Sequence, residues 1–202
     1  MRTILSFIFI TAATAAPSVA QRVVGGTAPP PFPPAKGTVT LRRTLPAHYI
    51  PDTLKDLSAR SAAVVEAYVQ TTLPPQEIPA GSLFTDAVLL VTRVFKGPAD
   101  LKTIVVGQPG GAIGEFKVKP VQYDLMQPGE HYILFLRNEN RRNLAERPGM
   151  NRFAVTAEWG GYFRIESDGN ISLARGTSPA LRNSYTGKPA SQMVNELLSL
   201  NP

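Results

Sequence analysis

The sequence predicts a mainly β (α+β) domain: a five-stranded OB-like barrel with a short leading helix and a C-terminal amphipathic helix. Short runs of β-branched and aromatic residues, separated by Gly, Pro and Asp, are typical of strands. Several runs are apolar on both faces, as expected where one face lines a barrel and the other is covered. Helical spacing of apolar residues precedes the first run and follows the last. Closing five strands into a barrel removes exposed sheet edges.

The first twenty residues are predicted to be a cleavable secretory signal. Arg2 gives a positive start, residues 4–16 are apolar, and 18–20 (Ser-Val-Ala) are the small residues that a signal peptidase recognises. An uncleaved anchor is the alternative, but a membrane span needs about 20 apolar residues. No later stretch of the sequence reaches that length. We therefore expect an exported protein, periplasmic or extracellular, with no transmembrane segment in the mature chain.

Composition restricts the chemistry of the mature chain. The sequence has no cysteine, which excludes disulfides, thiolate metal sites, cysteine nucleophiles and a lipid-modified N-terminal cysteine. The net charge is +6, and removal of Arg2 with the signal lowers it to +5. This excess favours anionic partners only slightly. The remaining length of about 180 residues suits one domain with a substantial core.

Residues 21–49 are predicted to be a Pro-rich extended arm or linker before a single domain at 50–202. Five of the six residues at 29–34 are proline, which favours extended, polyproline-type chain. A spacer is the favoured interpretation, and a proline-rich recognition ligand is the alternative.

The elements of the domain are predicted in order along the chain. A short helix is expected within residues 51–61, because Asp52 or Thr53 can cap it and its leucines share one face. The barrel strands are expected at 63–69, 84–95, 103–106, 131–136 and 152–156. A further pair of strands at 162–166 and 171–173 is joined by a Ser-Asp-Gly-Asn turn.

An amphipathic helix is predicted after Pro189 at the end of the chain. Its apolar stripe consists of Met193, Val194, Leu197, Leu198 and Leu200. Packing of this stripe on the barrel is the favoured interpretation, since apolar stripes usually face the parent core. A partner-binding helix is the alternative.

Three motifs in the predicted strands and turns occur in the order of a known family. They are VTRVFKG (91–97), IVVGQPGG (104–111) and PGEHYILFL (128–136). In that order they resemble secreted bacterial domains similar to the netrin-like, tissue-inhibitor-of-metalloproteinase OB barrel, over residues 54–165. The resemblance implies turns and core strands but no catalytic residue. Inhibitors of that fold place an N-terminal cysteine on the enzyme's zinc, whereas this chain would start at Gln21 and has no cysteine.

An arginine-rich segment, Arg137 to Arg152, is predicted to join the fourth and fifth barrel strands. OB barrels bind oligonucleotides or oligosaccharides at this position. Two aromatic residues that follow would offer stacking faces. The candidate ligand-binding residues are Arg137, Arg141, Arg142, Arg147, Arg152, Trp159 and Tyr162. A solvated basic loop that binds nothing is the alternative.

The leading functional hypothesis is an exported, monomeric, non-enzymatic interaction domain with an unknown envelope or extracellular partner and no cofactor. One alternative is a binder of anionic envelope polymers or lipid head groups through the arginine-rich segment. Another is an enzyme of unfamiliar type that uses His131, Glu130 and Asp124. We expect no catalytic or metal site, because two histidines cannot form a three-histidine zinc site.

Overall fold

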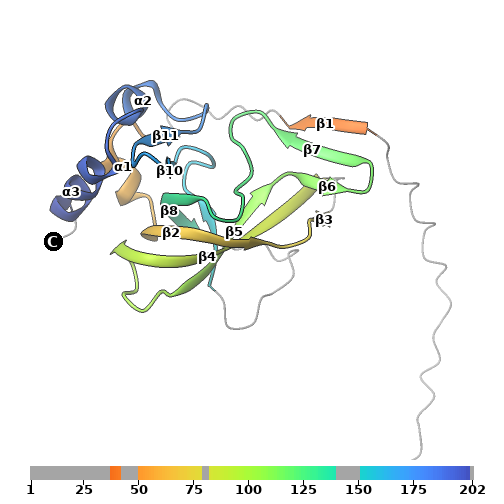
Figure 1. Ribbon diagram of the computed structural model, residues 1–202, viewed down its shortest axis with the longest axis horizontal. Coiled ribbons are helices and arrows are strands. Elements are labelled where there is room, and N and C mark those ends of the chain that lie inside the picture. The colour runs from red at the N-terminus through yellow and green to blue at the C-terminus, as the bar shows by residue number, and fades with distance from the viewer. Residues whose placement is uncertain (1–36, 42–49, 79–81, 140–150, 201–202) are drawn as a thin grey trace, which may run out of the picture. The chain divides into compact units, whose positions relative to one another are not determined.

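The computed structural model describes residues 37–41, 50–78, 82–139 and 151–200. The described residues form strands and three short helices. Figure 1 shows α1 (Leu54–Ala59), α2 (Pro179–Tyr185) and α3 (Ala190–Leu200) gathered beside β10 (Tyr162–Ile165) and β11 (Ile171–Leu173). The predicted signal, most of the predicted arm and the centre of the arginine-rich segment lie outside the described residues. Within the described part of the chain, no helix is long and apolar enough to cross a membrane.

Five strands form a closed barrel. They are β2 (Ala63–Thr72), β4 (Ser82–Lys96), β5 (Thr103–Pro109), β8 (His131–Asn138) and β9 (Asn151–Val155). β2 pairs antiparallel with β4 and β8, and β4 pairs antiparallel with β5. β9 runs parallel to β5 and closes the circle antiparallel to β8. The closed order β2-β4-β5-β9-β8 confirms the predicted five-stranded OB-like barrel.

Two strands extend the barrel sheet beyond β8. β10 (Tyr162–Ile165) pairs antiparallel with the first half of β8, and β11 (Ile171–Leu173) pairs with β10. A short strand, β3 (Gln76–Ile78), pairs with the start of β4. The second half of β8 pairs with β9, so one edge of β8 is divided between β9 and β10.

A separate three-stranded sheet was not predicted. It contains β1 (Gly37–Leu41), β7 (Phe116–Pro120) and β6 (Gly111–Ile113). β1 runs parallel to β7, and β7 is antiparallel to β6. The described part of the predicted arm is therefore a strand paired with the body of the domain.

The three helices are short, and α1 and α2 begin at side-chain caps. In α1 (Leu54–Ala59) the Thr53 side chain caps the first turn by accepting from the Asp56 amide at 3.1 Å. In α2 (Pro179–Tyr185), which was not predicted, Ser178 is the cap and Pro179 occupies the first position. The C-terminal helix α3 (Ala190–Leu200) confirms the predicted one.

The buried residues form two clusters on opposite sides of the sheet. One fills the barrel, and the other lies between the outer face of the sheet and the helices. β8 supplies both, because Leu134 and Leu136 face the barrel interior while Ile133 and Phe135 face the helices. This explains why the strand is apolar at consecutive positions. In α3, Met193 and Leu197 are buried in the outer cluster, whereas Leu198 is 52% exposed.

The turn between β9 and β10 places Trp159 in the core. Ala157 and Glu158 both have positive φ angles, of 52° and 57°, which is unusual for residues with side chains. The indole of Trp159 is buried and lies directly against the backbone of Gly176. A Cβ atom at position 176 would overlap the indole ring, so glycine is required there by close approach.

Replacement of Gly176 by alanine is expected to lower the free energy of unfolding by about 1–3 kcal/mol or more, because the added methyl overpacks the site. Urea denaturation of the parent and the Gly176→Ala variant measures this change. A Trp159→Phe substitution removes part of the overlapping ring, so the loss should be smaller in that background. Equal losses in both backgrounds would show that the Trp159 contact is not the cause.

Candidate functional site

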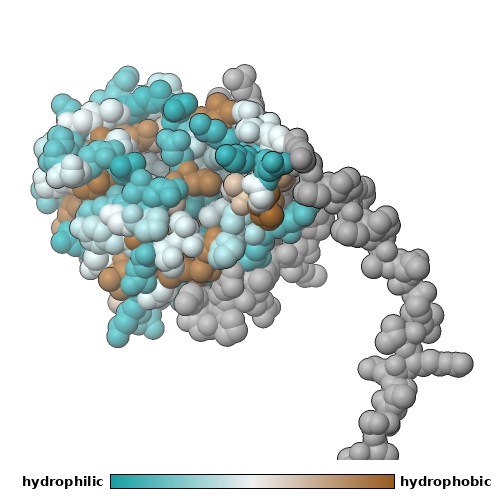
Figure 2. Space-filling view, turned by 45° about the vertical axis from the view of Figure 1, so that its right-hand side comes forward, coloured by the Kyte–Doolittle hydropathy of each residue, from teal (hydrophilic) through white to brown (hydrophobic). Residues whose placement is uncertain are grey.

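Exposed large hydrophobic side chains are few on the described surface. On the face seen in Figure 2, hydrophobic residues form small separate patches among hydrophilic ones. The large hydrophobic side chains that are exposed among the described residues are Tyr68, Leu90, Ile113 and Leu198. Small, separate patches are ordinary for a protein surface. A local concave site is therefore a better candidate than a broad apolar interface on this face.

A small cavity of about 140 Å³ opens where β10 and β11 meet the segment that precedes β8, and we call it the cup. The cup is lined by Tyr123, Asp124, Tyr132, Tyr162, Arg164, Ser172, Leu173, Ala174 and Arg175. Sites for drug-sized ligands are typically about 300–1,000 Å³. The cup therefore suits a single chemical group or the end of a larger molecule.

Three tyrosines form the aromatic wall of the cup. Tyr123 stacks on Tyr162 with ring centroids 5.5 Å apart, and Tyr132 meets Tyr162 edge to face at 6.1 Å. The Tyr123 hydroxyl donates to the Pro109 carbonyl at 2.7 Å. Burial raises the pKa of both Tyr132 and Tyr162, so their hydroxyls stay protonated. The wall is neutral and held by its own contacts.

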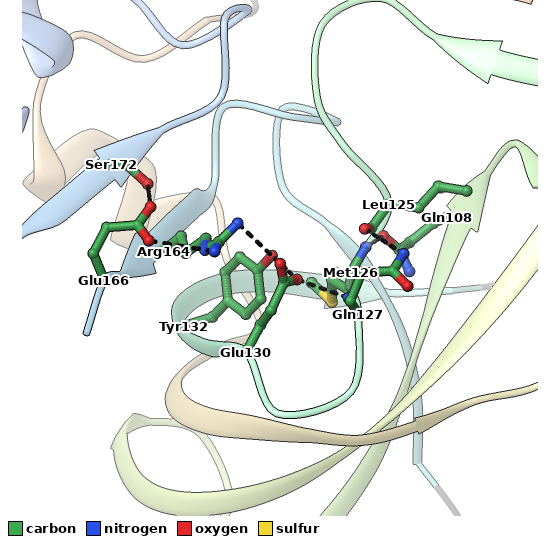
Figure 3. A network of polar contacts seen from close by, with 9 residues as sticks. All are labelled: Gln108, Leu125, Met126, Gln127, Glu130, Tyr132, Arg164, Glu166 and Ser172. Carbon is green, nitrogen blue, oxygen red and sulfur yellow. Dashed lines mark hydrogen bonds and ion pairs between the residues drawn. The ribbon is translucent and has the colours of Figure 1, made fainter.

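Arg164 is fixed in the cup by two carboxylates (Figure 3). Its Nη1 lies 2.9 Å from Glu130 and its Nη2 lies 3.3 Å from Glu166. Glu130 also accepts from the Tyr132 hydroxyl and the Gln127 amide, both at 2.7 Å. Glu166 accepts from the Ser172 hydroxyl at 2.5 Å. This network sets the guanidinium position before any ligand arrives.

A fully buried polar side chain lies behind the tyrosine wall. The Gln108 side-chain oxygen accepts from the Met126 amide at 2.8 Å and lies 3.4 Å from the Tyr162 hydroxyl. Its Nε2 has no hydrogen-bond partner among the described residues. Buried donors in native proteins are nearly always paired. The wall of the cup is thus backed by a polar group with unused donor capacity.

The rim of the cup carries one cation and one anion. Arg175 follows β11 and Asp124 precedes β8, and both side chains are exposed. Neither has an ion-pair partner within the described ranges of the chain. The rim therefore offers hydrogen-bond donors from Arg175 and acceptors from Asp124.

The residues predicted to bind ligand do not form one site among the described residues. Arg141, Arg142 and Arg147 lie outside the described residues. Arg137 is half-buried on β8, and Trp159 is buried in the barrel core. Of the four described members of the predicted set, Tyr162 alone lines the cup, and it does so as a buried wall residue.

Arg152 belongs to a buried ion pair on β9. Its Nη1 and Nη2 donate to the two carboxylate oxygens of Asp86 at 2.6 and 2.5 Å. The Arg152 side chain is 13% exposed and that of Asp86 only 2%. Gly107 leaves room for the pair, since a Cβ there would lie 2.9 Å from Nη2. Arg152 therefore holds β9 to the barrel through β4.

Of the three residues of the enzyme hypothesis, Asp124 and Glu130 lie at the cup, whereas His131 does not line it. His131 Nε2 lies 3.0 Å from a Glu66 oxygen, and its ring stacks on Tyr68 with centroids 3.9 Å apart. Glu130 serves the Arg164 network, and Asp124 is on the cup rim. Within the residues that the structure describes, no group of three His, Asp or Glu side chains is placed to hold a metal ion.

Sequence reasoning missed Tyr123, Arg164 and Arg175 as site residues. They lie far apart along the chain, and the pairing of β10 with both β8 and β11 brings their segments together. A local motif cannot reveal such a site. A long-range strand-pairing pattern would have been needed.

No protein-family model matches the chain, and no curated protein matches it. The resemblance to the netrin-like OB barrel therefore stays a prediction.

An Arg152→Ala substitution is expected to lower the free energy of unfolding by about 3–5 kcal/mol, because it removes the two charged hydrogen bonds that Arg152 donates to the buried Asp86 carboxylate. Denaturant unfolding measures the loss. The Arg137→Ala variant is the control, and it should lose much less. An Asp86→Leu/Arg152→Met double variant should recover most of the stability. A small effect of Arg152→Ala would contradict the structural role of the pair.

The Glu66 carboxylate is expected to make stability depend on pH. His131, whose Nε2 lies 3.0 Å from a Glu66 oxygen, is the main cause that lowers the pKa of Glu66, and the charge of Arg93 acts in the same direction against burial. Because the folded pKa lies below the ordinary value of 4.5, its stabilising contribution is complete above that value and is lost as pH falls through the folded pKa.

Unfolding of the parent and a Glu66→Gln variant between pH 3 and 7 tests this dependence. The stability difference should be largest above about pH 5 and should vanish in acid. Glu77→Gln removes an exposed carboxylate without an ion-pair partner among the described residues and is the control. A difference between parent and Glu66→Gln that does not change with pH would exclude the proposed cause.

Proposed function

We propose that the chain is an exported, non-catalytic interaction domain that binds a hydroxyl-rich group, such as one sugar unit of an envelope or extracellular glycan, in the cup. The observation that carries this proposal is a pair of rim side chains, Arg175 and Asp124, that have no ion-pair partner among the described residues and lie beside a tyrosine wall. The predicted signal at residues 1–20 supports export.

The mixed polarity of the cup favours hydroxyl groups over a simple anion. Two arginines, Arg164 and Arg175, stand beside three carboxylates, those of Asp124, Glu130 and Glu166. Their combined charge does not attract an anion. A sugar hydroxyl both donates and accepts, so it can bond an arginine and an aspartate at once. The tyrosines of the wall are 5–8% exposed, so they supply a small apolar surface for part of a sugar ring.

The fixed geometry of the cup also supports binding. Arg164 is held by two ion pairs, and Tyr132 is held by Glu130. Groups that are already ordered lose little conformational entropy when a ligand arrives. The small volume of the cup is consistent with recognition of one unit of a polymer rather than of a whole drug-sized molecule.

The anionic-polymer hypothesis stays a prediction with less support. Of its five arginines, three lie outside the described residues and Arg152 is paired with Asp86. The described residues therefore supply no cationic cluster at that segment on which to build the hypothesis.

Titration of the full chain with soluble chito-, cello- and malto-oligosaccharides, followed by NMR amide shifts, tests the proposal. Shifts should cluster at residues 123–124, 162–164 and 172–175. Arg175→Ala and Asp124→Asn should each weaken binding about tenfold or more, because each removes a hydrogen bond to a charged group.

Lys55→Ala, which removes an exposed charge on α1, is the matched control and should bind like the parent. Absence of shifts with all three sugar series, or shifts unaffected by both rim substitutions, would exclude the cup as a glycan site.

A further inference from the structure

β1 forms an edge of the small sheet. It pairs with β7 through one side, in a parallel register from Gly37–Phe116 to Leu41–Pro120. No described strand pairs with its other side. An edge strand presents unpaired N–H and C=O groups that can template another extended chain.

One face of this sheet is exposed and basic. Thr38 lies opposite Lys117 and Thr40 lies opposite Lys119, and all four residues are exposed. The intervening Val118 is buried on the other face. The two lysines have no ion-pair partner in the described part of the chain. Their charge is therefore available on the same face as the β1 threonines.

Residues 37–41 carry no charge, proline or bulge of the kind that protects many edge strands. Natural edges carry charged residues, proline or bulges that discourage added strands. Residues 37–41 (Gly-Thr-Val-Thr-Leu) contain no charge and no proline, and their pairing with β7 is regular at all five positions. β-Branched residues at three successive positions favour the extended conformation. The edge is therefore suited to accept a further strand.

We propose that the open side of β1 accepts an extended, acidic peptide segment of a partner protein as an additional strand. Neighbouring strands lie about 4.8 Å apart, so the added strand would lie about 10 Å from β7. Long lysine side chains at 117 and 119 reach across that spacing toward carboxylates on the same face. Backbone hydrogen bonds supply affinity, and the lysines select acidic side chains at alternate positions.

Charge selects this occupant over a second copy of the chain. β1 of another copy would bring an uncharged strand and, beside it, two more exposed lysines on β7. Such a pairing leaves the lysines without carboxylates. An acidic peptide neutralises them and adds the same backbone hydrogen bonds.

Two peptides that carry the same charge but differ in their backbone N–H donors test strand addition on the full chain. An acetylated, amidated (Glu-Thr)₃ peptide should bind and shift the NMR amide signals of residues 37–41. The same peptide with N-methyl groups at alternate residues keeps its charge but loses donors on one side, so it should bind at least tenfold more weakly. A (Lys-Thr)₃ peptide should not bind.

Variants of the chain distinguish peptide binding at β1 from non-specific electrostatic attraction and from binding in the cup. Lys117→Glu/Lys119→Glu should weaken (Glu-Thr)₃ binding at least tenfold, whereas Lys55→Glu/Lys102→Glu, with equal net charge, should not. Arg175→Ala should leave peptide binding unchanged. Thermal unfolding verifies that each variant is folded. The comparison of the peptides on the parent chain tests the proposal even if a variant does not fold.

Three outcomes would overturn the proposal. The first is equal binding of the N-methylated and unmodified peptides, which would indicate attraction of any polyanion. The second is amide shifts confined to regions away from residues 37–41. The third is concentration-dependent dimerisation through β1 that (Glu-Thr)₃ does not compete with, which would assign the edge to a second copy.

Discussion

The division of one edge of β8 between β9 and β10 is the constraint on which the rest of the structure depends. At the point of division, the Phe135 carbonyl accepts from the Thr156 amide at 2.8 Å and the Phe135 amide donates to the Gly161 carbonyl at 3.1 Å. One strand thus closes the barrel while the other leaves it. Gly161 permits this, because a Cβ there would lie 2.8 Å from the Phe135 carbonyl oxygen.

That division also creates the cup. β10 carries Tyr162 and Arg164 alongside the start of β8, where Tyr132 lies. A barrel closed along the whole length of β8 would have paired that half of the strand with β9, and the Glu130–Arg164 ion pair would not form. Architecture and candidate site therefore have a common cause. The helices contribute by covering the outer face of the same strands.

The sequence predicts the barrel well because its signals are local. The apolar run at 132–136, buried on both faces, and the turn residues that bound each run identify strands without reference to their partners. The sequence assigns residues 37–41 to the arm, because a five-residue strand beside a proline run has no periodicity long enough to detect. Arg152 was assigned to a ligand site because a sequence does not show which carboxylate, here Asp86, will face an arginine.

The packing of Trp159 determines where the intrinsic fluorescence of the protein originates. Trp159 is the single tryptophan of the chain, and its ring stacks near Tyr123 with centroids 6.3 Å apart. Tyr123 also stacks on Tyr162, and both rings line the cup. The intrinsic fluorescence of the protein therefore originates one ring away from the candidate ligand. The chain carries an optical reporter of cup occupancy that needs no label.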